Sequence, residues 1–489
     1  YMKPYQDPSL APRRRAEALL SEMTTEEKCM QLGCISDHEV YGETLALSED
    51  KMREAIPDGI GGLVLYPKTK LSDVEICSQE IRTIQRYLME NTRLGIPALP
   101  HVEAICGPWI FGATNYPEPI GLAATWNPAG VERMADAIRR ELRAIGYRQV
   151  LSPVMDIYRD PRWGRVGETY GEDPYLSSAM AVGYVRGEQG NDLADGILAT
   201  LKHFLGYGYP VGGLNMATQP ITNRELFEVF ARPFDACIRE AGAQCIMNSY
   251  GNIDGIPINE SKEILTDLLR GTMGFEGFTV SDYRSINRSS ETFGTARDIQ
   301  QAGVQSFNAG LDMEMPKRIA YGRLMVEAVN DGRISMDRLD DAVLRVLLVK
   351  FKLGLFENPY PAEDKIIAST VCTPESRTLS GELAAESAVL LKNENKLLPL
   401  KKGIKRLAVI GPNADSLRCM FAGYSAPGWI DMFIGPPSEK VFPGMEYFCA
   451  EYGIRMNEDA PLLDRENFDA FMARGMEYAL HQMYPHAQT

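Results

Sequence analysis

Several polar residues of this 489-residue sequence follow apolar, strand-like runs, where they could take part in chemistry. The clearest is Asp282, which ends the run "GFTVSD" where a turn residue would be ordinary. A carboxylate that is held at a strand end by packing behind it can act as a nucleophile or as a general base. The simpler interpretation is an aspartate that caps the next turn, and an isolated "SD" favours it. The case for chemistry therefore depends on the residues that accompany Asp282.

Four other segments bring side chains suited to a polyhydroxylated ligand. Singly, each side chain has a structural explanation, such as a satisfied core histidine or an arginine paired with a neighbouring carboxylate. Together, carboxylates, cations and aromatic rings favour a neutral sugar over a nucleotide, because the chain has no glycine-rich phosphate loop and no metal-ligand set. The segments are "HVEAICG" with Glu103, "RDPRWGRVGETYGEDPYL" with Arg162, Trp163 and Arg165, "KHF" with Lys202 and His203, and "MNSYGNIDG" with Met247 and Tyr250.

The elements that position these residues alternate between strands and helices from about residue 58 to 310. Six near-continuous apolar runs, each followed by a helical pattern, predict a parallel sheet that is buried on both faces. Polar side chains end strand after strand, and only a closed barrel brings all of these ends to one mouth. The sequence therefore predicts a (β/α)8 TIM-like barrel over residues 1–355, with a capping box at Thr24 and Glu27 ahead of an early helix.

The pattern changes after residue 355. Prolines break the helical periodicity, and residues 356–375 are expected to form a linker. A helix over 379–393 and a strand over 405–414 then indicate a second α/β layer. We expect residues 376–489 to form an α/β sandwich domain that is short or truncated.

Composition limits the partners of the chain. A formal net charge of −15 argues against nucleic acid and against anionic membrane surfaces. No run is long and apolar enough to cross a bilayer, and nine scattered cysteines without a CxxC pair suggest reduced thiols in the cytoplasm. A periplasmic or secreted location stays open if a leader has been removed, as does a homo-oligomer. We expect no metal and no cofactor.

The motifs quoted above strongly resemble glycoside hydrolase family 3, the exo-acting β-glycosidases, over about residues 6 to 425. The resemblance implies a barrel followed by an α/β sandwich, retaining hydrolysis and no cofactor. It also implies roles for individual residues. Asp282 matches the nucleophile, Tyr250 a tyrosine that contacts it, and Met247 a residue of the pocket wall, while the residues that match hydrogen-bonding partners of the terminal sugar are Glu103, Arg165, Lys202 and His203. A cation near Asp282, either Arg165 or Lys202, is expected to keep it ionised.

The sequence departs from the family pattern at several positions. Val102 and Cys106 replace an acidic residue and a histidine, and Gly167 stands where a glutamate is common. Many glucosidases of the family have an aspartate at the position that matches Glu103. The glutamate is longer by one methylene, reaches further into the sugar site and would crowd an exocyclic hydroxymethyl group, so xylosides compete with glucosides as substrates.

Retaining hydrolysis also needs an acid/base about 5 Å from the nucleophile. The resemblance places that glutamate in the second domain, but the tail after about residue 425 has no segment that matches. Glu439, Glu446, Glu451 and Glu458 have no motif behind them, so the acid/base stays unassigned. The sequence leaves two hypotheses: a retaining exo-β-glycosidase that acts on β-glucosides or β-xylosides, or a catalytically silent or weak sugar-binding relative.

Overall fold

Seven parallel strands form the sheet at the centre of the fold. The computed structural model describes residues 3–42, 46–65 and 74–411, and beyond them residues 414, 421, 423–426 and 428. The strands are paired in the order β1-β2-β3-β4-β5-β6-β9. They are β1 (Cys34–Ser36), β2 (Gly62–Val64), β3 (Leu99–Val102), β4 (Gln149–Val150), β5 (Leu198–Phe204), β6 (Cys245–Asn248) and β9 (Phe278–Val280). Almost every residue in them is buried, which explains their continuous apolar character.

An eighth segment, around Met313, closes the sheet into a ring. The Ser281 amide donates a hydrogen bond to the Met313 carbonyl at 2.8 Å on one side. The Glu314 amide donates to the Leu32 carbonyl at 2.9 Å on the other, directly before β1. Because this segment bonds to both edges of the sheet, the sheet has no free edge there. The prediction of a (β/α)8 TIM-like barrel is confirmed.

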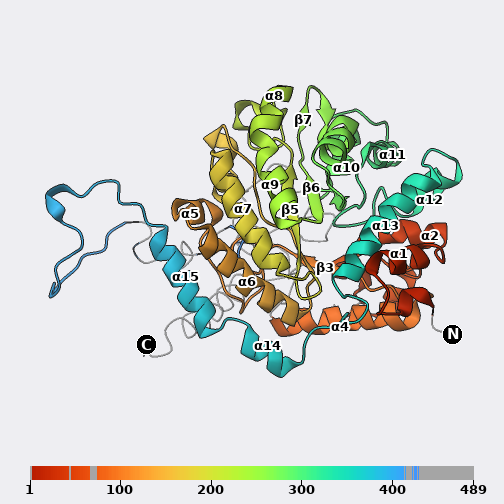
Figure 1. The fold of residues 1–489 in the computed structure, drawn as a ribbon, viewed down its shortest axis with the longest axis horizontal. Coiled ribbons are helices and arrows are strands. Elements are labelled where there is room, and N and C mark those ends of the chain that lie inside the picture. Colours follow the sequence, from red (N-terminus) through yellow and green to blue (C-terminus); the bar gives the residue numbers. More distant parts are fainter. Residues whose placement is uncertain are drawn as a thin grey trace, which may run out of the picture.

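Helices surround the strands (Figure 1). Helix α6 shows why they pack there, since Val131, Met134, Ile138 and Leu142 recur at helical spacing and are all buried. The predicted capping box is present at the start of α2, where the Thr24 side chain accepts from the Glu27 amide. The main helices are α1 (Pro12–Leu20), α2 (Thr25–Gln31), α4 (Val74–Asn91), α6 (Pro128–Ile145), α7 (Pro174–Gln189), α9 (Arg232–Ala241), α11 (Ile299–Ala309), α12 (Arg323–Asn330) and α13 (Met336–Lys352), with π-helical turns over Leu226–Phe230 and Glu263–Thr272.

The chain after the barrel differs from the prediction in its local structure. The expected linker contains α14 (Asp364–Thr370), and α15 (Pro374–Glu386) begins inside it and ends earlier than the predicted helix. Residues 405–411 form no strand. Leu407, Val409 and Ile410 are 67%, 67% and 91% exposed, so the described residues offer no partner strand or packed face that would hold this segment extended. The domain boundaries stay a prediction, and most of the expected sandwich lies outside the described residues.

Two further findings concern the described residues alone. None of their helices is long and apolar enough to cross a membrane. Seven of the cysteines lie in this part of the chain, and all of them are free, six being buried.

Candidate active site

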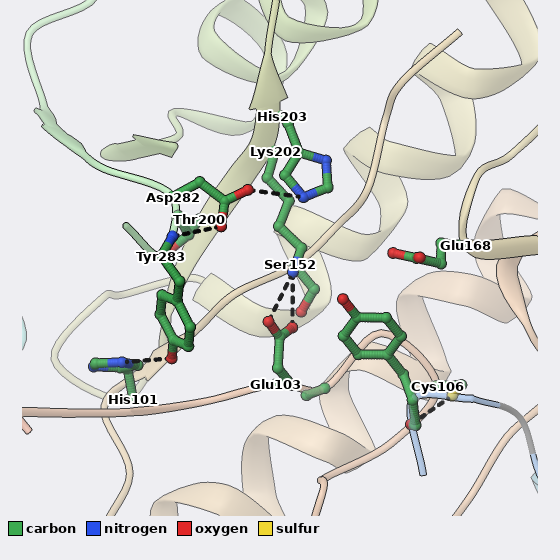
Figure 2. A network of polar contacts seen from close by, with 12 residues as sticks. His101, Glu103, Cys106, Ser152, Glu168, Thr200, Lys202, His203, Asp282 and Tyr283 are labelled. Carbon is green, nitrogen blue, oxygen red and sulfur yellow. Dashed lines mark hydrogen bonds and ion pairs between the residues drawn. The ribbon is translucent and has the colours of Figure 1, made fainter. Parts of the chain in front are cut away.

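Side chains from four parts of the barrel meet at the carboxyl ends of its strands. Glu103 follows β3, Lys202 and His203 lie in β5, and Asp282 follows β9. Figure 2 shows Glu103 and Lys202 pointing toward each other, with Asp282 and His203 doing the same beside them. Arg165 joins them from the long loop after β4. The barrel thus brings together residues that are as far apart as 179 positions in the sequence, as its topology predicts.

Glu103 and Lys202 form a buried ion pair. Lys202 Nζ lies 2.9 Å from Glu103 Oε1 and 2.8 Å from Oε2, and the two side chains are 2% and 12% exposed. Burial raises the pKa of Glu103, while Lys202 acts to lower it. The pair can offer both donors and an acceptor to sugar hydroxyls without adding net charge to the site.

His203 is held through one ring nitrogen, and its other nitrogen faces Arg165 and Asp282. Its Nδ1 lies 2.7 Å from Asp156 Oδ2, and its backbone amide bonds to the same oxygen. Burial raises the pKa of Asp156 to about 8. Burial, with Arg165 and Lys202, lowers the pKa of His203, so the ring is neutral. Asp156 therefore fixes the orientation of the His203 ring.

Asp282 has one oxygen fixed and one free. Oδ1 accepts a hydrogen bond from the Tyr283 amide at 2.7 Å. Oδ2 is buried, lies 3.6 Å from His203 Nε2, and has no hydrogen-bond partner among the described residues. Burial raises the pKa of Asp282, whereas Arg165 and Lys202 act to lower it. The predicted cations are thus both present, but burial outweighs them and the pKa lies above its ordinary value.

Arg165 links this centre to residues that the sequence did not single out. It makes two hydrogen bonds of 2.7 Å to Glu168, and its Nη2 lies 3.2 Å from both His203 Nε2 and the Tyr424 hydroxyl. The other arginine of this loop, Arg162, is exposed and pairs with Asp160 at 2.6 Å.

Tyr424 reaches the barrel mouth from beyond α15. Its ring centroid lies 5.3 Å from Lys202 Nζ. Its backbone carbonyl accepts a hydrogen bond from Cys106 Sγ at 3.1 Å, and the next carbonyl, of Ser425, accepts one from Trp109 Nε1 at 2.7 Å. Cys106, a departure from the family pattern, thus holds this segment against the barrel. A tyrosine after a glycine in an irregular stretch gives no sequence signal for such a contact.

The remaining expected residues are only partly placed by these contacts. Burial, and after it the Asp282 charge, raise the pKa of Tyr250, and the Tyr250 side chain in turn acts to lower the pKa of Asp282 against the effect of burial. Met247 is buried in β6, and its place in the pocket wall stays a prediction. At the unusual Gly167, a Cβ would lie 2.9 Å from Glu118 Oε2. Any side chain there would therefore require the Glu118 carboxylate to shift.

Comparisons with known proteins agree with this architecture. Residues 24–349 match the glycosyl hydrolase family 3 N-terminal domain, and residues 388–446 match the C-terminal domain of the same family. A β-xylosidase of Formosa agariphila is 38% identical over 347 residues, which make up 67% of this chain and 48% of that protein. A periplasmic β-glucosidase of Salmonella typhimurium is 34% identical over 416 residues, 84% of this chain and 52% of that protein.

Solved structures give the same result. A β-glucosidase from Erythrobacter marinus superposes with a TM-score of 0.81 at 33% identity, over 93% of this chain and 59% of that one. A β-glucosidase from Listeria innocua in complex with glucose superposes with a TM-score of 0.71 at 32% identity, over 79% and 53%. The chain spans about half the length of the curated relatives it matches. Because the N-terminal family model covers most of the barrel, the chain belongs to glycoside hydrolase family 3.

Proposed function

We propose that the protein is a retaining exo-β-glycosidase that releases the terminal sugar from β-glucosides or β-xylosides. The observation that carries this proposal is the Asp282 carboxylate. It lies at the barrel mouth with one oxygen anchored and the other buried without a partner, between a neutral histidine and the Glu103–Lys202 pair. A carboxylate that is desolvated and oriented in this way is suited to attack an electrophilic carbon.

In the proposed first step, Asp282 Oδ2 attacks the anomeric carbon of the bound sugar. A bond from carbon to this oxygen forms while the bond to the aglycone oxygen breaks, and that oxygen takes up a proton. In the second step, water breaks the glycosyl ester and gives up a proton, so two inversions retain the configuration. Glu103, Lys202, His203 and Arg165 hold the sugar hydroxyls. The acid/base is unassigned, and the tail glutamates considered for it lie outside the described residues.

Glu103 is proposed to set the choice between pentosides and hexosides. Glu103→Asp should raise kcat/KM for a p-nitrophenyl β-glucoside relative to the xyloside by about 10-fold, because a side chain shorter by one methylene leaves room for the hydroxymethyl group. Steady-state kinetics on both substrates measure the ratio. A parallel fall of both values, with the ratio unchanged, would show that Glu103 binds a hydroxyl shared by the two sugars and does not discriminate between them.

The proposed function is tested by trapping the glycosyl-enzyme. The full chain is incubated with 2-deoxy-2-fluoro-β-glucosyl and β-xylosyl 2,4-dinitrophenolates, and intact mass is followed by peptide mapping. Dinitrophenolate leaves without protonation, so the outcome does not depend on the unassigned acid. A mass gain on Asp282 would support the proposal, and the faster donor would identify the glycone. A folded protein that neither donor labels would favour the silent sugar-binding relative.

A further inference from the structure

We propose that His101 is a positioning residue, which holds Asp282 in its reactive orientation through Tyr283. The inference rests on the proposed function, because it concerns the same carboxylate. His101 lies on β3, two residues before Glu103. Its Nε2 lies 3.1 Å from the Tyr283 hydroxyl, and the two rings meet edge to face with centroids 6.2 Å apart. Figure 2 shows this contact below Asp282.

The contact crosses the barrel. Strands β3 and β9 are not neighbours in the sheet, so no backbone ladder joins the nucleophile's strand to that of His101. The side-chain hydrogen bond between His101 and Tyr283 therefore links the segment after β9 to the opposite wall. It fixes the Tyr283 side chain between two rigid strands, which hold geometry better than a loop does.

Tyr283 passes this constraint to the nucleophile through its backbone. The Tyr283 amide donates the 2.7 Å hydrogen bond that Asp282 Oδ1 accepts. With Oδ1 held, the carboxylate cannot rotate freely, and Oδ2 stays turned toward the site. Tyr283 thus contacts His101 through its hydroxyl group and donates a hydrogen bond to Asp282 through its backbone amide.

The turn that contains Tyr283 includes a strained backbone position. The next residue, Arg284, has a φ of 60°, in the left-handed region that disfavours non-glycine residues. The turn is closed by the Ser285 amide, which donates to the Asp282 carbonyl at 3.0 Å. A strained conformation persists only where surrounding contacts hold it, and the His101–Tyr283 contact is one of these.

The state of His101 fits positioning and not proton transfer. The residue is fully buried, and burial lowers its pKa to about 3, so the ring is neutral at physiological pH. Its Nδ1 makes no hydrogen bond of good geometry among the described residues, although the Leu99 backbone lies near enough to act on the pKa. An apolar residue would fill this place without burying two polar ring nitrogens, so packing alone does not account for a histidine here.

The test compares His101→Leu, which removes the contact, with His101→Gln, whose amide can reach the Tyr283 hydroxyl. Dinitrophenolate release from the activated donors reports glycosylation directly. We expect His101→Leu to lower the maximal rate of this release by about 30-fold with the half-saturating donor concentration nearly unchanged, as a misplaced nucleophile would. His101→Gln should recover most of the rate. In a double-mutant cycle, Tyr283→Phe should add little to His101→Leu. Additive effects, or a rise in the half-saturating concentration alone, would overturn the proposal.

Crystal structures separate this inference from the proposed function. If the wild-type protein forms no glycosyl-enzyme, the function fails, and the positioning role is decided by structures of wild type, His101→Gln and His101→Leu. If His101 positions Asp282, the hydrogen bond from the Tyr283 amide to Asp282 Oδ1 is present in the wild type and in His101→Gln and is lost in His101→Leu. An unchanged bond in His101→Leu would overturn it, and His101→Gln gives a folded variant if His101→Leu does not fold.

Discussion

Asp282→Ala is expected to lower the rate of glycosyl-enzyme formation by about 10⁴-fold or more, the scale on which removal of a catalytic nucleophile acts. The reason is geometric. Oδ2 of Asp282 is buried without a hydrogen-bond partner among the described residues and lies 3.6 Å from Nε2 of the neutral His203, whereas Asp156 binds the other ring nitrogen of that histidine. Neither Glu103 nor Glu168 can replace it, because both of their carboxylates are occupied by Lys202 and Arg165. Burst measurements of dinitrophenolate release give the rate.

A small external nucleophile separates loss of chemistry from loss of structure. With a dinitrophenyl glycoside, azide can enter the space left by the carboxylate of Asp282→Ala and give a glycosyl azide of inverted configuration. The control is Asp254→Asn, at an exposed left-handed position that asparagine tolerates well, and it should leave the rate unchanged. Labelling of the Asp282→Ala protein at another carboxylate would show that the nucleophile has been assigned to the wrong residue.

Most of the barrel was predictable because six of its strands carry a local signal. Six strand runs fall on β2 to β6 and on β9, since parallel strands buried on both faces are continuously apolar. Two parts of the ring lacked that signal. Strand β1 lies before the alternation of strands and helices that begins near residue 58, and the segment at Met313 joins the ring through an isolated bridge to Val280. These two segments are identified as parts of the barrel only from their hydrogen bonds in the closed ring.

The site was predictable to the extent that its residues lie at the carboxyl ends of strands. Glu103 and Asp282 come just after β3 and β9, Lys202 and His203 lie near the end of β5, and the four meet as expected. Glu168 lies in a single 3-10 turn and Tyr424 in a stretch outside the helices and strands, where no periodicity gives the direction of a side chain, and their roles emerge from contact with Arg165. For the pKa of Asp282, the sequence predicted the neighbouring cations but not the extent to which the carboxyl group is buried. The balance of these opposing effects depends on packing.

Asp312 carries the largest expected effect on stability. It follows α11, is fully buried, and forms ion pairs with Arg270 at 2.6 Å, Arg338 at 2.9 Å and Arg345 at 3.1 Å. Its Oδ2 also accepts from the Thr279 amide in β9 at 3.0 Å. Burial alone would raise its pKa, but the three arginines outweigh burial and lower it. The carboxylate therefore stays charged. It links the segment around Met313, which closes the ring, to β9 and to α13.

Asp312→Asn should lower the free energy of unfolding by about 3–5 kcal/mol, because it leaves three partly buried guanidinium groups without their anion while keeping the shape of the side chain. Urea unfolding followed by tryptophan fluorescence measures the change. The matched control is Asp331→Asn, which removes an aspartate paired with Arg333 at 2.6 Å at an exposed position, where water screens the pair and little change is expected. If both variants unfold at the same urea concentration as wild type, the three arginines do not depend on Asp312, and barrel closure rests on apolar packing and backbone hydrogen bonds alone. If only Asp312→Asn is destabilised, the buried charge of Asp312 holds the segment around Met313 to α13.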